Sequence, residues 1–293
     1  MRPVVLPLVA GALAVAVPSS LSAQRSSPAI AFTSARSGQS AIWIMAADGG
    51  GQHRLTAPGM IAAEAAWSGD GRSVAFAGSK DGYRFHIFTI GVDGRGLRQV
   101  TRGAGNDHDP AWSSDGRIAF DNDRTGDAEI YLVHADGSGL RRLTRAPAND
   151  SDPAWSPDGG KIVFGADRDD FFHVWVMNAD GRGQRRLTRE RGGEPAWSPD
   201  GRTIAFATAR DGDPDIYVMR PDGSGQRALT HNFAEDFPPT WSPDSRRIAF
   251  ASDRRGGNFD IWVMDADGSG QRRLTSNRGW ETDPAWRPAP PSR

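Results

Sequence analysis

The chain has 293 residues, of which 35 are basic and 36 acidic, and its formal net charge at pH 7 is −1. This balance gives no overall attraction to nucleic acid or to an anionic membrane surface. Cysteine is absent, which excludes a disulfide framework, a thiol nucleophile and a lipid anchor carried by cysteine.

The first 23 residues have the features of a secretory signal peptide. Arg2 supplies the positive start, an apolar run covers residues 4–17, and the small residue Ala23 suits cleavage. The run is too short to span a membrane and no second one follows, so no membrane insertion is expected. We expect a periplasmic or secreted mature chain, beginning with a short segment at residues 24–28.

One unit of about 43 residues recurs along the rest of the chain, a period typical of propellers and other repeat folds. Its tryptophan stands at Trp67, Trp112, Trp155, Trp197, Trp241 and Trp286. The first copy lacks the Pro-Ala-Trp segment and starts at Ile30, whereas the last copy consists of that segment alone. The two fragments complete one unit, so we expect the N-terminal strands to pair with the C-terminal strand and close a ring.

Each unit predicts four strands. In the fourth tryptophan copy these lie at residues 194–197, 203–207, 216–219 and 226–230, separated by Ser-Pro-Asp-Gly, a variable loop and Pro-Asp-Gly-Ser-Gly. Four antiparallel strands per unit, repeated radially, predict an all-β, six-bladed propeller over residues 29–287, followed by a tail at 288–293. A closed ring has no free inner edge, so a monomer is expected. The arginine pairs of the outer strands are interpreted as edge protection rather than as a nucleic-acid surface.

The motifs PAWSPDG, IAFxSxR, DIYVMxADG and RLT resemble the WD-like repeat of TolB-type β-propellers, over residues 30–286. The resemblance implies a binding domain that engages other envelope proteins through one propeller face. TolB proper resembles a two-part protein with a smaller domain before its propeller. Here only residues 24–28 separate the signal peptide from the first strand, so the resemblance implies a TolB-like propeller without that domain.

Strand polarity gives the ring two different faces. The Ser-Pro-Asp-Gly and Ala-Asp-Gly-Ser-Gly turns share one face and are nearly identical in every unit. The loops after the second and fourth strands share the other face and differ between units. Sameness between repeats indicates a requirement of the fold, and difference leaves freedom for function. We therefore expect a binding site on this variable-loop face.

Acidic residues stand at the start of the innermost strands, where they are expected to ring the mouth of the central channel. The candidate binding carboxylates are Glu64, Asp107, Asp109, Asp150, Asp152, Glu194, Asp236 and Asp283, and Glu281 shares the pattern. A base ends the second strand of each unit, at Arg36, Lys80, Arg124, Arg168, Arg210 and Arg254. Two interpretations remain open: repeated structural acid–base pairs, or an acidic collar that accepts a cation or a basic peptide.

Three aromatic residues in the variable loops, Phe233, Phe237 and Trp280, are candidates for an exposed protein-binding patch. The alternative is that they cap the blades and pack inward. His108, between Asp107 and Asp109, is the one histidine placed to serve as a base or ligand at the channel mouth.

These features predict a non-catalytic binding platform that engages an envelope protein through its variable-loop face. One alternative is a polysaccharide lyase that uses the channel-mouth acids and His108. Another is a sensor of a cation or small ligand. No cofactor is expected, with Ca²⁺ at the channel mouth as an open alternative, because hard cations prefer several carboxylate oxygens.

Overall fold

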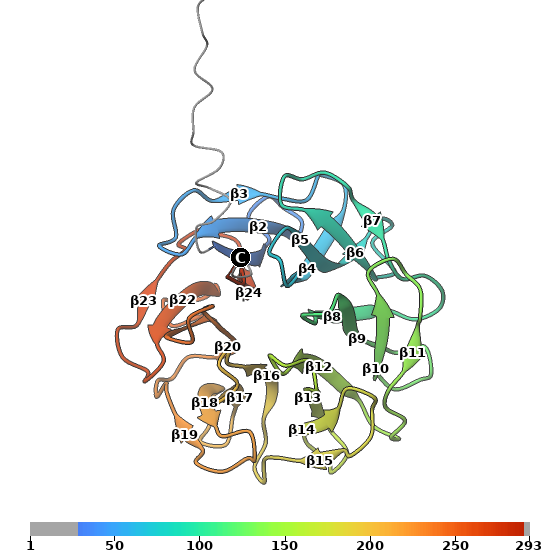
Figure 1. Ribbon diagram of the computed structural model, residues 1–293. Coiled ribbons are helices and arrows are strands. Elements are labelled where there is room, and N and C mark those ends of the chain that lie inside the picture. Colours follow the sequence, from blue (N-terminus) through green and yellow to red (C-terminus); the bar gives the residue numbers. More distant parts are fainter. Residues whose placement is uncertain (1–28, 290–293) are drawn as a thin grey trace, which may run out of the picture.

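The computed structural model describes residues 29–289. The predicted signal peptide, the segment at residues 24–28 and the end of the tail therefore lie outside the described residues. Within them the strands form six separate four-stranded antiparallel sheets, arranged as blades around a common axis (Figure 1). The all-β propeller predicted from the sequence is confirmed.

We number the blades along the chain and give their strands from the axis outward. Blade 1 consists of β24 (Glu281–Trp286), β1 (Ala29–Ser34), β2 (Ala41–Ala46) and β3 (His53–Arg54). Blade 2 consists of β4 (Ile61–Trp67), β5 (Ser73–Ser79), β6 (His86–Gly91) and β7 (Arg98–Gln99). Blade 3 consists of β8 (Asp107–Trp112), β9 (Arg117–Asn122), β10 (Glu129–His134) and β11 (Arg141–Arg142).

The second half of the ring repeats the same order. Blade 4 consists of β12 (Asp150–Trp155), β13 (Lys161–Ala166), β14 (His173–Asn178) and β15 (Arg185–Arg186). Blade 5 consists of β16 (Gly193–Trp197), β17 (Ile204–Thr208), β18 (Asp215–Met219) and β19 (Arg227–Ala228). Blade 6 consists of β20 (Asp236–Trp241), β21 (Arg247–Ser252), β22 (Asp260–Asp265) and β23 (Arg272–Arg273).

Ring closure occurs in blade 1, where the two ends of the chain share one sheet. β24 pairs antiparallel with β1, with Ile30 opposite Trp286 and Ser34 opposite Glu281. This pairing supplies the inner strand that the first repeat lacks, so the predicted closure is confirmed.

The hydrophobic core lies between the blades rather than at the axis. Each of six buried clusters combines residues of two neighbouring blades, as where Phe250 and Trp262 of blade 6 pack with Ile216 of blade 5. The central phenylalanine of every second strand is fully buried, at Phe32, Phe76, Phe120, Phe164, Phe206 and Phe250. Sheets of this kind are covered on both faces by their neighbours, which explains why both faces of the middle strands are apolar.

Two kinds of hydrogen bond recur around the ring. The threonine that ends each unit accepts a hydrogen bond from the backbone N–H of the second residue of the third strand, as in Ile216 N–H to Thr230 Oγ1 at 2.9 Å. An outer-strand arginine reaches the neighbouring blade, as in Arg98 to the Asp136 carbonyl at 2.6 Å. The arginines thus bind the blades to one another. Among residues 29–289, no helix is long and apolar enough to cross a membrane.

Candidate functional site: an acidic collar on the variable-loop face

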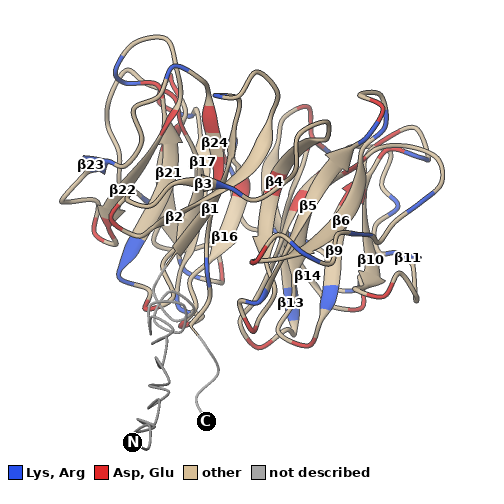
Figure 2. Ribbon diagram, turned by 90° about the horizontal axis from the view of Figure 1, so that it is seen from above, with Lys and Arg blue, Asp and Glu red and all other residues tan. Residues whose placement is uncertain are grey.

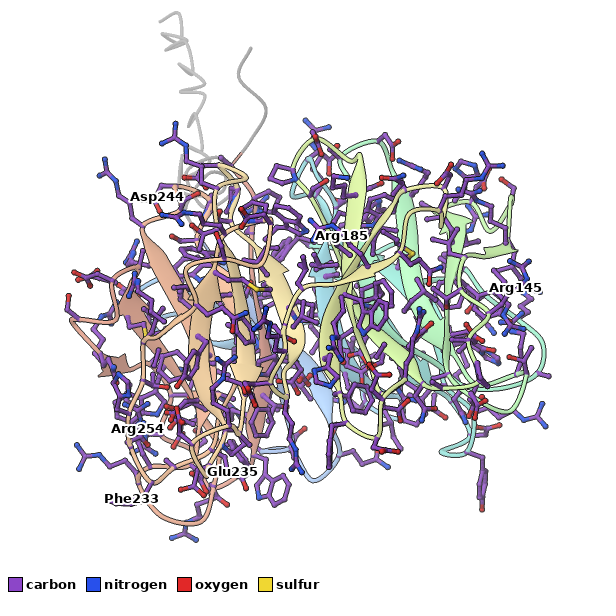
Figure 3. The ribbon with its side chains drawn as sticks, turned by 90° about the horizontal axis from the view of Figure 1, so that it is seen from below. Arg145, Arg185, Phe233, Glu235, Asp244 and Arg254 are labelled. Carbon is purple, nitrogen blue, oxygen red and sulfur yellow. The ribbon has the colours of Figure 1, made fainter. Side chains whose placement is uncertain are left out.

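The two faces of the ring are separated as the repeats predict. Figure 3 places Phe233, Glu235 and Arg254 at one face and Asp244, which belongs to a Ser-Pro-Asp turn, at the other. On the variable-loop face, the backbone N–H of Glu235 donates to Asp253 Oδ1 at 3.0 Å, which links two loops of blade 6. The loops after the second and fourth strands therefore meet at this face.

The structure divides the acids at the start of the innermost strands into two groups. We call the first group the support carboxylates: Asp107, Asp150, Asp236 and Glu281. Each is at most 1% exposed and forms an ion pair with the base that ends the second strand of its own blade. The pairs are Asp107 with Arg124, Asp150 with Arg168, Asp236 with Arg254, and Glu281 with Arg36.

Each paired arginine also lies on an aromatic ring of its blade. The guanidinium carbon of Arg254, for example, is 4.6 Å from the ring centroid of Trp262, while its Nη2 is 2.8 Å from Asp236 Oδ2. A buried carboxylate and an aromatic face thus hold each cation. Asp107, Asp150 and Asp236, which the sequence grouped with the binding candidates, support the blades from within and are not free to meet a ligand.

The second group, which we call the collar carboxyls, consists of Glu64, Asp109, Asp152, Glu194 and Asp283. Figure 2 shows acidic positions on the innermost strands β24 and β4, toward one end of the ring. All five are partly exposed, and no ion pair with lysine or arginine is found for them among residues 29–289. They come from blades 2, 3, 4, 5 and 1, so they approach the axis from five directions.

A repeated backbone irregularity aims these side chains. Each collar residue has a positive φ, between 47° and 59°, and each lies where the pairing register between the first and second strands shifts. Such a bulge breaks the strict alternation of side chains and redirects the residue within it. Blade 6 has Pro238 at this position and no carboxyl group.

Four collar carboxyls, Asp109, Asp152, Glu194 and Asp283, have raised pKa values. Burial raises the pKa of Asp109 and of Glu194 well above the usual value, and neighbouring collar carboxyls add to both effects. Burial also raises the pKa of Asp152, and that of Asp283 to about 6. Their partial exposure leaves them accessible from the axis, while the ring wall replaces much of their water.

His108 joins blade 2 to blade 3 at this collar. Its Nδ1 lies 3.1 Å from Glu64 Oε2, and its ring centroid is 5.1 Å from that of Phe85. Burial acts to lower the pKa of His108, but the hydrogen bond and charge of Glu64, together with the charges of Asp121 and Asp123, outweigh it, so the net pKa is raised. Among residues 29–289, no group of three or more His, Cys, Asp or Glu side chains is arranged to hold a metal ion. The Ca²⁺ alternative stays an untested prediction.

One further carboxyl, Asp121 on β9, was not among the candidate binding residues named from the sequence. It is 6% exposed, and burial raises its pKa to about 8, with Asp152 and Glu64 adding to the rise. A comparison of the repeats could have found it. The equivalent positions hold Thr33, Ala77, Gly165, Ala207 and Ala251, so Asp121 is an acid that the fold does not require.

The three residues of the predicted aromatic patch differ in their exposure to solvent. Phe233 is fully exposed and Trp280 is 59% exposed, whereas Phe237 is half-buried. The Phe237 ring lies 5.2 Å from Phe259, which in turn lies 6.0 Å from Trp280. Phe237 and Phe259 thus support Trp280 from below, and Phe233 extends freely from the loop between β19 and β20 (Figure 3).

Two segments of the chain, residues 107–194 and 190–290, match the TolB beta propeller domain family. The protein belongs to this family. An uncharacterized protein of Agrobacterium fabrum, Atu1656, is 35% identical over 128 residues, which is 43% of each chain. The chain thus aligns with less than half the length of this curated relative.

Solved structures show the same fold. TolB from Acinetobacter baumannii superposes with a TM-score of 0.80 at 22% identity, over 89% of this chain and 66% of that one. A structure assigned to TolB from Agrobacterium tumefaciens gives 0.71 at 23% identity, over 88% and 91%. At these identities the likeness establishes the architecture, and the function has to be argued from the site.

Proposed function

We propose that this TolB-like propeller is a non-catalytic binding platform that engages another envelope protein, in the periplasm or after secretion, through its variable-loop face. The observation that carries the proposal is the combination on one face of carboxyls that form no ion pair with lysine or arginine among residues 29–289 and large aromatics in contact with water. Folding alone favours neither, because unpaired charges and exposed aromatic rings both cost free energy.

The aromatic residues supply the anchoring part of such a surface. Burial of a Trp or Phe side chain contributes on the order of 2 kcal/mol, and aromatic residues are frequent among those that dominate binding energy. Trp280 is held by Phe259 beneath it, so little side-chain entropy is lost when a partner covers it. Phe233 stands in the preceding variable loop and can enter a pocket on the partner.

The opposite face offers much less to a partner. Its aspartates accept hydrogen bonds within their own turns. The Ser242 hydroxyl donates to Asp244 Oδ1 at 2.6 Å, and the backbone N–H of Arg246 donates to the same oxygen at 3.1 Å. The same two bonds recur in other Ser-Pro-Asp turns, as at Asp200. These groups are satisfied within the fold, which supports placing recognition on the variable-loop face.

The test is affinity capture from an envelope extract of the producing organism with three forms of the mature protein. These are the wild type, a Phe233→Ser/Trp280→Ser variant, and an Arg202→Ala control on the opposite face. We expect a protein that is retained by the wild type and the control and lost by the double variant. Equal retention by all three forms would contradict a platform on the variable-loop face, and cell fractionation with an antibody tests the location separately.

A further inference from the structure

Asp121 is the most informative single departure from the repeat. Four of the five equivalent residues are alanine or glycine and the fifth is threonine, so the other blades place no charge here. Its carboxyl is almost completely buried, and its Oδ1 has no hydrogen-bond partner in the described part of the chain. A buried carboxyl oxygen without a hydrogen-bond donor is costly. Such a group is retained where something outside the fold supplies the donors.

The surroundings of Asp121 define what that group can be. The charges that act most strongly on it are those of Asp152, Glu64 and His108, and the Asp109 carboxyl lies within hydrogen-bonding reach. The Asp109 carboxyl also lies within such reach of Asp152. Blades 2, 3 and 4 therefore bring four carboxyl groups together: Glu64, Asp109, Asp121 and Asp152. His108 is the basic side chain among the groups that interact most strongly with Asp121. A second orphaned oxygen, Glu194 Oε2, belongs to the same collar.

The protein itself shows which chemistry suits such surroundings. In blades 1, 3, 4 and 6 a guanidinium group lies over an aromatic ring while it pairs with a buried carboxylate, as Arg168 does with Trp175 and Asp150. The collar beside Asp121 offers a similar combination, with carboxyl groups next to the rings of Phe85 and His108, whose centroids are 5.1 Å apart and whose planes are tilted by 34°. It lacks an arginine of its own.

We propose that this part of the collar receives a guanidinium or primary ammonium group of the partner, with Asp121 as its deepest contact. The inference rests on the proposed function and names the chemistry by which the platform recognises its partner: a segment with an arginine or lysine side chain. Guanidinium carries five donors in a planar fork and can bond several carboxyl groups at once. Organic cations are favoured over a metal because the described residues offer no group arranged to ligate one.

The first experiment titrates purified protein at pH 8 with small probes and follows binding by calorimetry. The probes are N-acetyl-arginine amide, its neutral analogue N-acetyl-citrulline amide, and CaCl₂. The test variant is Asp121→Ala, which installs the residue that three other blades have at this position and should therefore fold. The matched control is Asp127→Ala, which removes the same charge from an exposed position of the same blade.

We expect saturable binding of the arginine probe by the wild type and by Asp127→Ala. The citrulline probe should bind at least about tenfold more weakly, and Asp121→Ala should lower the affinity for arginine at least about tenfold, as expected for a buried charge pair that loses one partner. The inference is overturned if the two probes bind alike, if arginine binding survives Asp121→Ala, or if no saturation is reached at about 10 mM probe. Calcium binding that depends on Asp121, without arginine binding, would also overturn it and assign the site to a metal.

The outcome is separable from that of the proposed function. If the arginine probe does not bind while the aromatic patch still captures a partner, the platform stands and this inference fails. If the probe binds at Asp121 while no protein is captured, the cation site stands and the platform fails.

Discussion

Left-handed backbone at five acidic residues is the most consequential feature at the residue scale. A non-glycine residue with positive φ costs roughly 1–2 kcal/mol, and aspartate tolerates the conformation better than most. The chain accepts this cost at Glu64, Asp109, Asp152, Glu194 and Asp283. The bulge that contains each residue redirects its carboxyl away from the base that ends the second strand, so none of the five forms an ion pair with that base.

The raised pKa of Asp121 predicts a pH-dependent loss of stability. The ordinary value is 3.8 and the folded value is about 8, so the folded protein binds the proton more tightly, and stability falls as pH rises between these values. In Asp121→Asn this loss is absent. We expect the wild type to lose more unfolding free energy than the variant between pH 5 and pH 8, by at least about 1.4 kcal/mol, the equivalent of one pKa unit.

Urea titrations at the two pH values measure this difference. Asp127→Asn, in an exposed loop position of the same blade, should behave as the wild type does. Parallel pH dependence of the wild type and Asp121→Asn would contradict the prediction. Asp283, with a pKa raised to about 6, and His108, with a raised pKa, act in the same direction, so the wild type itself should be less stable at pH 8 than at pH 5.

The support carboxylates predict an asymmetry between two equivalent arginines. Arg254 pairs with the fully buried Asp236, whereas Arg210 lies over Phe206 and Tyr217 and binds Gln226, in a blade with Gly192 at the position of the support carboxylate. Arg254→Gln leaves a buried charge without its partner, which costs about 3–5 kcal/mol. Arg210→Gln should cost much less, and equal shifts of the two variants in urea unfolding would contradict this account.

At the scale of the element, the hairpin turn after each third strand has two structural roles. It reverses the chain through a glycine with positive φ, and it lies directly against the outer strand of the preceding blade. A Cβ placed on Gly268, where φ is +97°, would lie 2.7 Å from the carbonyl oxygen of Leu229. The same approach recurs between Gly223 and Leu187. These turns are therefore also contacts between blades, which explains why their sequence varies so little along the chain.

This close approach predicts different costs for two glycine substitutions. Gly38 has a φ of +93°, but a Cβ there would meet nothing within 4 Å. Alanine at either position is strained by the left-handed backbone. Only in Gly268→Ala does the new Cβ also clash with the neighbouring blade. We expect Gly268→Ala to be at least about 1 kcal/mol more destabilising than Gly38→Ala in thermal or urea unfolding. Equal losses would show that the turn can shift away from Leu229.

At the scale of the whole molecule, stability depends on closure. Every buried cluster joins two blades, so a blade with a missing neighbour exposes half of its apolar contacts. Closure itself is non-covalent and relies on the pairing of β1 with β24 and on Trp286 in the cluster between blades 6 and 1. The ring consequently unites the first and last described strands of the chain in one cooperative structure.

Removal of β24 should therefore destabilise the entire propeller. A chain truncated after residue 278 loses the inner strand of blade 1 and exposes the edge of β1, so we expect loss of cooperative thermal unfolding and aggregation. A circular permutant that links residue 287 to residue 29 and opens the loop between β11 and β12 keeps all six sheets and should unfold cooperatively. Calorimetry distinguishes the two, and a truncated chain with an unchanged transition would contradict the role assigned to closure.

The sequence by itself determined the architecture, because each blade is specified by local signals. Tryptophan spacing, Asp-Gly turns and alternating strands recur six times, and the complementary end fragments require closure. It also offered structural acid–base pairs as one of two interpretations of the repeated acids, and the structure shows such pairs for the earlier acids, as between Asp150 and Arg168.

Only the tertiary structure separated the two groups of acids. Asp107 and Asp109 are two residues apart, and in a regular strand they would face the same side. The bulge between them and the following Trp112 removes that alternation, so one carboxyl is buried beside Arg124 while the other approaches the axis. The site around Asp121 likewise brings together residues of three blades, from Glu64 to Asp152. Which groups converge there depends on how the blades pack, and no local pattern encodes that packing.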